Sequence, residues 1–414
     1  MRFFFPDSQD QIDPGFNFDT EEREPLRVRQ RDDLYAHEVF DPPPFDGLLV
    51  SKSIVDGYSD GTSGKYSSSQ RHRLYREHAR RFFRLDHAHG LLEIMGDCGA
   101  FSYWKDLEPP YDVEDVIDFY DGCEFDYGIS VDHVIFNKNP LGAQVHESDD
   151  ELKRWQERQE ITLTLANDFW KATKDGQVRF TPMGVAQGWH PASYAESVAH
   201  LQKIGYRRIA IGGMVPYKTN DIIGCLQAVN EVRQPETQFH LLGISRCEKI
   251  PTFARLGVTS LDSTSAFQQS YKDARNNYHT PDGAYTALRV KQVDGNVKLR
   301  KQIMAGEIDQ KLALKLERAA LNLLRKYDAG EATLEEAWDA LQKYSRLSDT
   351  TDRGTAYRRT LADRPWRNCP CPLCRELGID IVIFRGTERN KRRGFHNLYV
   401  FRQRLRAQLG EDRS

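Results

Sequence analysis

The stretch RFTPMGVAQGWHPASYAESVAHLQKIGYRRIAIGG, residues 179–213, contains a short apolar run, a helical pattern and a second short apolar run. Within residues 192–204, apolar side chains recur at three- and four-residue spacing, which is typical of an amphipathic helix. The flanking runs, 179–187 and 207–213, have the length of buried strands. A strand, a helix and a second strand in this order predict one unit of a parallel sheet.

The same alternation extends from this unit in both directions. Further strand-like runs are 48–55, 91–96, 127–136, 240–245 and 258–263, and residues 147–175 form a second clear helical pattern. Seven strands predict an α/β fold, a TIM-type (β/α)8 barrel in which one strand is not recognised. An open doubly wound sheet is the alternative. No Gly-rich phosphate turn follows an early strand, so the barrel is preferred.

The remaining segments predict appendages to the barrel. Helical patterns separated by the turns MAGE and DAGE interrupt the alternation and indicate a helical insertion. The expected parts are an N-terminal lead-in or lid at 1–46, the catalytic (β/α)8 barrel at 47–283, the helical insertion at 284–347, and a zinc-binding segment with barrel closure at 348–414.

The composition is that of a globular protein. Hydrophobic residues make up 39% and charged residues 29% of the 414 residues, far from the composition of disordered chains. No run of eighteen apolar residues occurs, and the opening MRFFFPDSQDQ lacks the pattern of a signal peptide. The seven cysteines are an odd number in a chain without an export signal. We therefore expect a cytoplasmic protein with no disulfides and no membrane partner.

Nucleic-acid binding by this chain would require local basic surface, because the formal net charge is only −3. The helical insertion at 284–347 and six arginines in residues 71–84 are expected to contact phosphate, the arginines being Arg71, Arg73, Arg76, Arg80, Arg81 and Arg84. A second basic cluster lies between Arg385 and Arg406. For either cluster, the alternative is a solvated helix or loop face.

Three cysteines and one histidine near the end of the chain predict a metal site. Cys369, Cys371 and Cys374 lie in the motif Cys-Pro-Cys-Pro-Leu-Cys, and His396 follows them. Three thiolates and one imidazole make a closed structural Zn2+ site, which leaves no open position for a substrate or water. The alternative is three reduced cysteines in a loop and an unrelated histidine.

Polar residues and glycines follow several of the predicted strands. They are Asp97, Asp132, Gln187, Gly212, Gly213 and Asp262. In a barrel, the carboxyl ends of the strands form one mouth, where catalytic groups gather. Two carboxylates facing each other there can act as nucleophile and general acid/base at a glycosidic carbon. Taken singly, each aspartate is better explained as the N-cap of the next helix.

These residues lie in motifs that resemble those of the tRNA-guanine transglycosylase superfamily. In chain order the motifs are DCGAF at 97–101, Asp132, GVAQG at 184–188, IGGM at 211–214, LLGI at 241–244, SLDS at 260–263 and CPCPLC with a later HNL at 396–398. They are similar to the family's Asp-Ser-Gly-Gly-Phe/Tyr motif, base-recognising aspartate, Gly-Ile-Val-Gln-Gly, Gly-Gly-Leu, Leu-Met-Gly-Val, Met-Phe-Asp-Cys and zinc-site segments. The resemblance runs from about residue 90 to the zinc segment.

The resemblance implies a covalent exchange of bases on a nucleic acid. Asp262 is implied to attack the sugar C1′ and release guanine, and Asp97 to act as general acid/base. The implied base-binding residues are Asp132, Gln187, Gly212 and Gly213 at the polar edge of the base, with Phe101 and Leu242 on its ring faces. The nucleotide must be flipped out or single-stranded to reach such a site.

Departures from the family pattern indicate DNA rather than tRNA. Ser263-Thr264-Ser265 replaces the Pro-Thr-Arg of the tRNA enzymes, whose compact bacterial members also lack the insertion. No archaeal-type RNA-binding domain follows the zinc segment. The pattern is similar to the DpdA-type DNA-guanine transglycosylases, which install 7-deazaguanines such as preQ0. Expected partners are DNA, with tRNA as the alternative, and a 7-deazaguanine base, with a helper ATPase as an open alternative.

Two further interpretations of the same residues stay open. A catalytically silent nucleic-acid-binding subunit is one, and the presence of both Asp97 and Asp262 argues against it. A sugar hydrolase on the same barrel is the other, and it would leave the zinc segment and the arginine clusters without a use.

Overall fold

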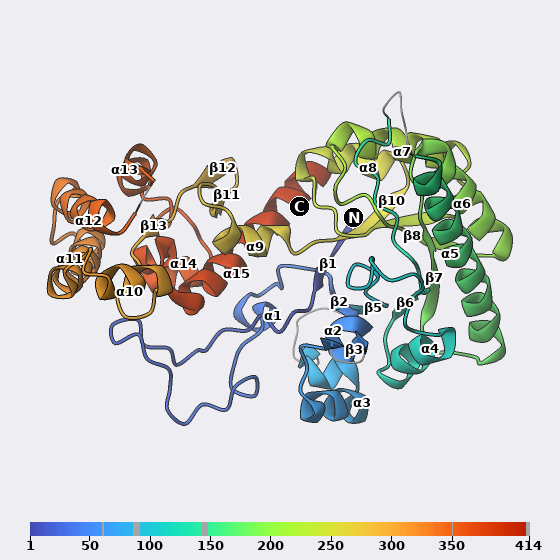
Figure 1. Cartoon of the computed structure of the whole chain (residues 1–414), viewed down its shortest axis with the longest axis horizontal. Helices are drawn as coiled ribbons and strands as arrows, with labels where there is room; N and C mark the ends of the chain where they lie inside the picture. Colours follow the sequence, from blue (N-terminus) through green and yellow to red (C-terminus); the bar gives the residue numbers. More distant parts are fainter. Residues whose placement is uncertain (60–61, 86–91, 142–147, 350, 411–414) are drawn as a thin grey trace. The chain divides into compact units, whose positions relative to one another are not determined.

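The computed structural model describes residues 1–59, 62–85, 92–141, 148–349 and 351–410. Eight parallel strands form a closed barrel in the order β1-β10-β9-β8-β7-β6-β5-β2 (Figure 1). Their bounds are β1 Arg2–Pro6, β2 Gly47–Ser51, β5 Glu93–Asp97, β6 Tyr127–Ile129, β7 Thr181–Ala186, β8 Arg208–Ile211, β9 Gln238–Leu241 and β10 Val258–Asp262. The predicted (β/α)8 barrel is confirmed, and all seven predicted strands contribute to it.

The strand that the sequence did not reveal is β1. It pairs in parallel with β10 on one side and with β2 on the other, so it closes the barrel. Phe3 and Phe4 are fully buried there. Strands of a parallel sheet show a continuous apolar run rather than alternation. Here the run is only three phenylalanines long, and it stands in the range 1–46 expected to be a lead-in. From the sequence, residues 348–414 were expected to close the barrel.

Helices alternate with the strands after β2. They are α2 Lys52–Val55, α3 Ser68–Phe82, α4 Val113–Gly122, α5 Asp149–Asp175, α6 Pro191–Ile204, α7 Thr219–Glu231, η2 Cys247–Lys249 and α8 Ile250–Arg255, with a small pair of strands, β3 Gly57–Ser59 and β4 Thr62–Ser63. Helices α4 to α7 lie on the outside of the barrel (Figure 1). The predicted helices at 147–175 and 192–204 are α5 and α6. Among the described helices, none combines the length and the apolar character needed to cross a membrane.

Large apolar side chains fill the barrel. The cluster consists of Phe4, Leu49, Met95, Tyr127, Ile129, Met183, Val185 and Ala210. Because these residues come from β1, β2, β5, β6, β7 and β8, their packing fixes the strands relative to one another. The residues that follow the carboxyl ends of the strands are therefore held on a rigid support.

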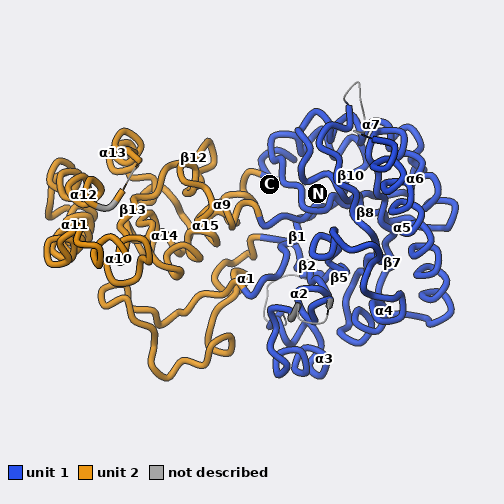
Figure 2. Tube along the Cα trace, in the orientation of Figure 1, with its two compact units in different colours: residues 1–9, 45–264, 405–414 blue, residues 10–44, 265–404 orange. Residues whose placement is uncertain are grey.

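The contacts of the chain divide it into two compact units (Figure 2). Unit 1 contains residues 1–9, 45–264 and 405–414, and unit 2 contains residues 10–44 and 265–404. Elements of unit 2 are α1 Ala36–Val39, α9 Ser265–Lys272, β11 Tyr278–Thr280, β12 Gly283–Tyr285, β13 Leu288–Arg289, α10 Val297–Met304, α11 Gln310–Ala329, α12 Leu334–Ser348, α13 Gly354–Asp363, α14 Pro372–Leu377, η3 Gly378–Val382, β14 Ile383–Phe384 and most of α15, Gly386–Leu409. These boundaries differ from the four ranges expected from the sequence.

The helical insertion contains α10, α11 and α12. Helix α11 ends at Gly330, whose φ of 83° is a left-handed conformation that favours glycine. Helix α12 begins after Thr333, whose hydroxyl accepts a hydrogen bond from the Glu336 amide while the Glu336 carboxylate accepts one from the Thr333 amide. The predicted turn DAGE therefore separates two helices. Its glycine ends α11, and the Thr333 cap that follows it begins α12.

Buried arginines of α15 fix the segment 10–44 within unit 2. Arg389 is 1% exposed and lies 2.7 Å from Glu21 and 2.8 Å from Asp380. Arg392 is 2% exposed and donates to the carbonyl of Asp13. Buried charges persist only when they are paired in this way. Much of the second basic cluster expected from the sequence is therefore internal framework rather than a phosphate-binding surface.

Candidate active site and metal centre

The predicted site residues lie at the carboxyl ends of five strands. Asp97 is the last residue of β5 and Asp262 the last residue of β10. Asp132 follows β6 by three residues, and Gln187 directly follows β7. Gly212 directly follows β8. Because the strands are parallel, these ends share one mouth of the barrel.

Asp262 is held by one of its two oxygens. Its Oδ1 accepts a hydrogen bond of 2.9 Å from the amide of Gly243 and lies 3.1 Å from Nε2 of His240. The residue is 5% exposed. Among the described residues, none donates a hydrogen bond to Oδ2. The carboxylate is thus oriented through Oδ1.

His240 is a site residue that the sequence analysis missed. It is fully buried, and its Nδ1 lies 2.9 Å from the hydroxyl of Ser260. Its ring packs edge-on against Phe4, with centroids 5.9 Å apart. An ionised carboxylate only accepts hydrogen bonds, so Nε2 carries the proton shared with Asp262. A histidine between the apolar residues Phe239 and Leu241 is the signal by which it could have been found.

Asp97 lies in an environment that favours its protonated form. The hydroxyl of Ser51 donates a hydrogen bond of 2.8 Å to its Oδ2. Burial, together with the negative charges of Asp132 and Asp262, raises the pKa of Asp97 to about 7. A carboxyl group that titrates near neutral pH can both give and take a proton, as a general acid/base must.

Asp132 and Gln187 form one buried hydrogen-bonded edge. The amide of Gln187 donates a 2.6 Å hydrogen bond to Oδ2 of Asp132, and the backbone amide of Ile135 donates to Oε1 of Gln187. Burial raises the pKa of Asp132 to about 6. The thiol of Cys98 donates to Oδ1 of Asp132 and accepts from the hydroxyl of Tyr103. The pair therefore presents fixed donors and acceptors of the kind that read the polar edge of a base.

The glycines after β8 allow the backbone to approach this edge. Gly213 has a φ of 77°, and a side chain there would lie 2.5 Å from the carbonyl of Ile135 and 2.8 Å from Oε1 of Gln187. A side chain on Gly212 would also meet Gln187. The hydroxyl of Tyr194 donates to the carbonyl of Gly212 and fixes the turn.

The two residues expected on the ring faces of the base differ in their surroundings. Phe101 is 65% exposed and contacts the ring of Phe136 edge-on at 5.6 Å. Leu242 packs against the apolar cluster of the barrel. Phe101 is therefore an exposed aromatic side chain, whereas Leu242 is anchored in the core.

The six arginines of 71–84 are not equivalent. Arg80 donates to both carboxylate oxygens of Asp126 at 2.9 Å and to the carbonyl of Leu92. Arg73 pairs with Glu77 at 3.0 Å. Arg71 donates to the backbone carbonyl of Asp56, and Arg84 is half-buried just after α3. Arg76 and Arg81 are exposed. Arg76 lies 3.2 Å from Glu77, so Arg81 is the exposed member of the group that no described carboxylate approaches within ion-pair distance.

Arg80→Gln is expected to lower the free energy of unfolding by about 1 kcal/mol, because a paired carboxylate and a carbonyl lose their donor. Arg81→Gln removes the same charge from the same helix and should leave stability within about 0.5 kcal/mol of wild type. Urea unfolding followed by circular dichroism measures both changes. Equal stability of the two variants would show that the Arg80–Asp126 pair contributes nothing to the fold.

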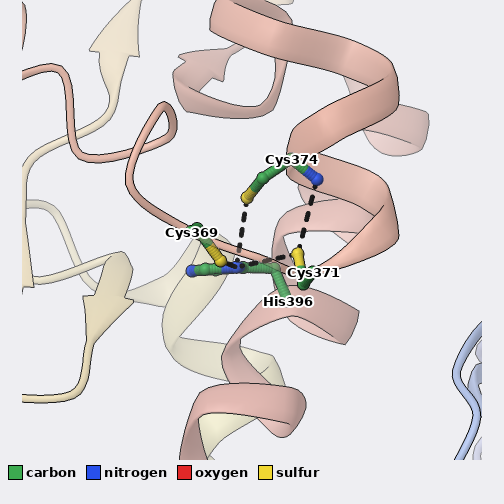
Figure 3. Close-up of side chains that lie close together, drawn as sticks. All are labelled: Cys369, Cys371, Cys374 and His396. Carbon is green, nitrogen blue, oxygen red and sulfur yellow. Dashed lines mark hydrogen bonds between the residues drawn. The ribbon is translucent and has the colours of Figure 1, made fainter.

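The three cysteines and the histidine predicted to bind a metal come together in unit 2 (Figure 3). Their ligand atoms all lie within 4.8 Å of one another. Nδ1 of His396 is 3.5 Å from Sγ of Cys369, 3.5 Å from Cys371 and 3.3 Å from Cys374. Nε2 of His396 donates to the carbonyl of His279 at 2.8 Å, so the lone pair of Nδ1 faces the sulfurs. The cluster can hold a metal ion.

Comparison with known proteins agrees with these features. No protein-family model matches the chain. A protein from Salmonella montevideo described as a DNA-guanine transglycosylase is 49% identical to the chain over 422 aligned residues, which cover 100% of this chain and 99% of that protein. The alignment therefore spans nearly the whole length of both proteins. The chain belongs to the DNA-guanine transglycosylase family, within the tRNA-guanine transglycosylase superfamily whose motifs it carries.

Proposed function

We propose that the protein exchanges guanine in DNA for a 7-deazaguanine base through a covalent glycosyl-enzyme intermediate. The observation that carries the proposal is the fixed Asp262 carboxylate, with Oδ1 held by Gly243 and His240 and Oδ2 left for attack. The full-length similarity to a DNA-guanine transglycosylase supports DNA as the polymer. The base-binding edge of Asp132 and Gln187 supports a flipped-out purine as the reacting group.

The first half of the proposed reaction removes guanine. Oδ2 of Asp262 attacks C1′, the bond between C1′ and N9 breaks, and its electron pair goes to the purine. Asp97 gives a proton to the departing guanine. The product of this half is DNA joined to Asp262 through an ester-like bond at C1′.

The second half inserts the new base. N9 of the 7-deazaguanine loses its proton to Asp97 and attacks C1′, and the bond between C1′ and Asp262 breaks. Asp97 is then protonated again and Asp262 is a free carboxylate. One glycosidic bond replaces another, so the exchange itself requires no ATP, and no step is assigned to a helper ATPase.

All seven cysteines are free, which agrees with a cytoplasmic location for the reaction.

We also propose that the metal is a structural zinc ion. A tetrahedral zinc with bonds of about 2.3 Å to sulfur and about 2.0 Å to nitrogen separates these atoms by roughly 3.5 Å. The three sulfur to nitrogen distances in the cluster are 3.5, 3.5 and 3.3 Å. Four protein ligands leave no open position for a substrate, so the zinc would cross-link α14, its preceding loop and α15.

The test of the proposed function is an exchange assay with labelled guanine. The protein is incubated with duplex DNA, single-stranded DNA or tRNA, and label in each polymer is counted. Incorporation into DNA is expected. Incorporation into tRNA alone would favour the alternative of a tRNA enzyme, and binding without incorporation would favour a catalytically silent subunit.

The rate of guanine release is expected to fall as pH rises through about 7. The pKa of Asp97 is raised to about 7, so the proton that the departing guanine needs is present below that pH and lost above it. Asp97→Asn should lower release by roughly 10²- to 10⁴-fold and should lack this limb of the pH profile. Single-turnover release from labelled DNA measures both. A wild-type rate that is flat through this range would mean that another group supplies the proton.

A further inference from the structure

The α10 and α11 helices carry exposed cations that no carboxylate of the described structure approaches within ion-pair distance. Six of these cations are Lys298, Arg300, Lys301, Lys311, Lys315 and Arg318. We call this set the α10–α11 basic surface. We infer that it binds the DNA backbone, an inference that rests on the proposed function and adds the place where unit 2 meets the substrate.

The arrangement of the charges on α11 supports this inference. Lys311, Lys315 and Arg318 are spaced by four and three residues, so they form one stripe along the helix. Like charges at this spacing destabilise an isolated helix. The helix carries two carboxylates, and both pair elsewhere: Glu317 is 6% exposed and lies 2.6 Å from Arg385, and Asp328 lies 2.7 Å from Arg367. Nothing in unit 2 that the structure describes neutralises the stripe.

Exposed apolar side chains accompany the cations on α10. Val297 and Met304 are 68% and 85% exposed, and they share one face of the helix with Arg300 and Lys301 at positions i, i+3, i+4 and i+7. The opposite face is anchored through Leu299, which is 1% exposed. Cations that meet phosphates beside apolar side chains that meet sugars or bases are a combination used by DNA-binding surfaces.

Three exposed lysines on other helices are paired with carboxylates. Lys343 on α12 lies 2.8 Å from Asp339, Lys153 on α5 lies 3.9 Å from Glu157, and Lys171 lies 3.6 Å from Asp168. The arginines in the first half of α15 are buried, and Arg80 is paired. In a chain of net charge −3, the α10–α11 basic surface therefore offers a concentration of uncompensated positive charge suited to DNA. An anionic membrane would use the same charge, and the test separates it from DNA.

The test compares two variants with the same change of net charge. In Lys311→Gln/Lys315→Gln/Arg318→Gln, the dissociation constant for a duplex oligonucleotide should rise about tenfold or more at physiological salt. The slope of log affinity against log salt should flatten by about 0.9 for each phosphate that the variant no longer neutralises. The control, Lys153→Gln/Lys171→Gln/Lys343→Gln, should match wild type in both. Fluorescence anisotropy over a salt series measures them, and thermal unfolding checks that each variant is folded.

The outcomes distinguish this inference from the proposed function. If wild type incorporates guanine into DNA but the stripe variant keeps its affinity and salt slope, the α10–α11 basic surface does not bind DNA and the proposed function stands. If wild type incorporates no guanine into DNA, the proposed function fails whatever the variant does. Loss of binding to phosphatidylserine vesicles, with DNA affinity unchanged, would overturn the inference in favour of a membrane. A raised KM for DNA with an unchanged kcat in the stripe variant would support it.

Discussion

Asp262→Asn should abolish guanine release and prevent any covalent bond between the protein and DNA. An amide is a very weak nucleophile, and the amide nitrogen or oxygen in place of Oδ2 cannot form the ester-like bond at C1′. The loss should be roughly 10⁴-fold or more. The interactions of Oδ1 with Gly243 and His240 are largely kept by the amide oxygen, so folding and DNA affinity should change little.

Denaturing gels measure this effect directly. Wild type incubated with DNA and a slowly reacting base analogue should give a band of reduced mobility, and Asp262→Asn should give none. Asp118→Asn, which changes an exposed aspartate of α4, is the matched control and should give the wild-type band. A persistent band in Asp262→Asn would overturn the proposed role and make Asp97 or Asp132 the nucleophile.

Cys371→Ser should remove bound zinc and destabilise unit 2 by several kcal/mol. Cys371 is fully buried, and it is both a member of the metal cluster and the residue that caps α14. Serine retains the capping ability but is a poor zinc ligand, so the change isolates the metal. Binding free energies of structural zinc are on the order of 10 kcal/mol, which allows a large loss.

Metal analysis and thermal unfolding together test this prediction. Wild type should hold about one zinc per chain. Cys247→Ser changes a half-buried cysteine outside the cluster and should retain both the zinc and the wild-type unfolding temperature. Zinc retained in Cys371→Ser, or folded wild type that contains none, would contradict the proposed zinc site.

The barrel could be predicted because its signals are local. The apolar runs that became β2 and β5 to β10 are each separated by a helical pattern or a turn, and such patterns survive in a single sequence. The strand β1 could not be found in this way, because Phe3, Phe4 and Phe5 precede a long irregular segment instead of a helix. Its place is decided by pairing with β10, more than 250 residues away.

The candidate site also contains residues that local sequence signals reveal and contacts that only the assembled sheet determines. The residues Asp97, Gln187 and Asp262 could be proposed from the sequence because each directly ends or follows a strand. The hydrogen bonds that distinguish Oδ1 from Oδ2 of Asp262, and the participation of His240, depend on the register of β9 with β10, which has an irregularity between Val258 and Ser260. That register is a property of the assembled sheet.

The feature that was hardest to predict from the sequence was which cationic side chains are left without an ion pair. Counting arginines along the chain indicated the segments 71–84 and 385–406, but ion pairs join residues that are distant in sequence. Arg389 and Glu21 are separated by 368 positions, and Arg80 and Asp126 by 46. The α10–α11 basic surface is less dense in the sequence, yet no carboxylate in the described part of the chain lies within ion-pair distance of its charges. Compensation, rather than density, decides which cations are available to DNA.

The discontinuous course of the chain has a consequence for biosynthesis. The polypeptide passes from one unit to the other at residues 9–10, 44–45, 264–265 and 404–405. On the ribosome, all eight barrel strands have been made once residue 262 has emerged, yet the segment 10–44 must wait for later partners, first Arg325 of α11 and then the arginines of α15. Until then Glu21 and Asp13 lack their final partners. The nascent barrel therefore carries a long loop that lacks its final contacts, and truncation before α15 would leave that loop with its contacts to Gln292 and Arg325 but without those to α15.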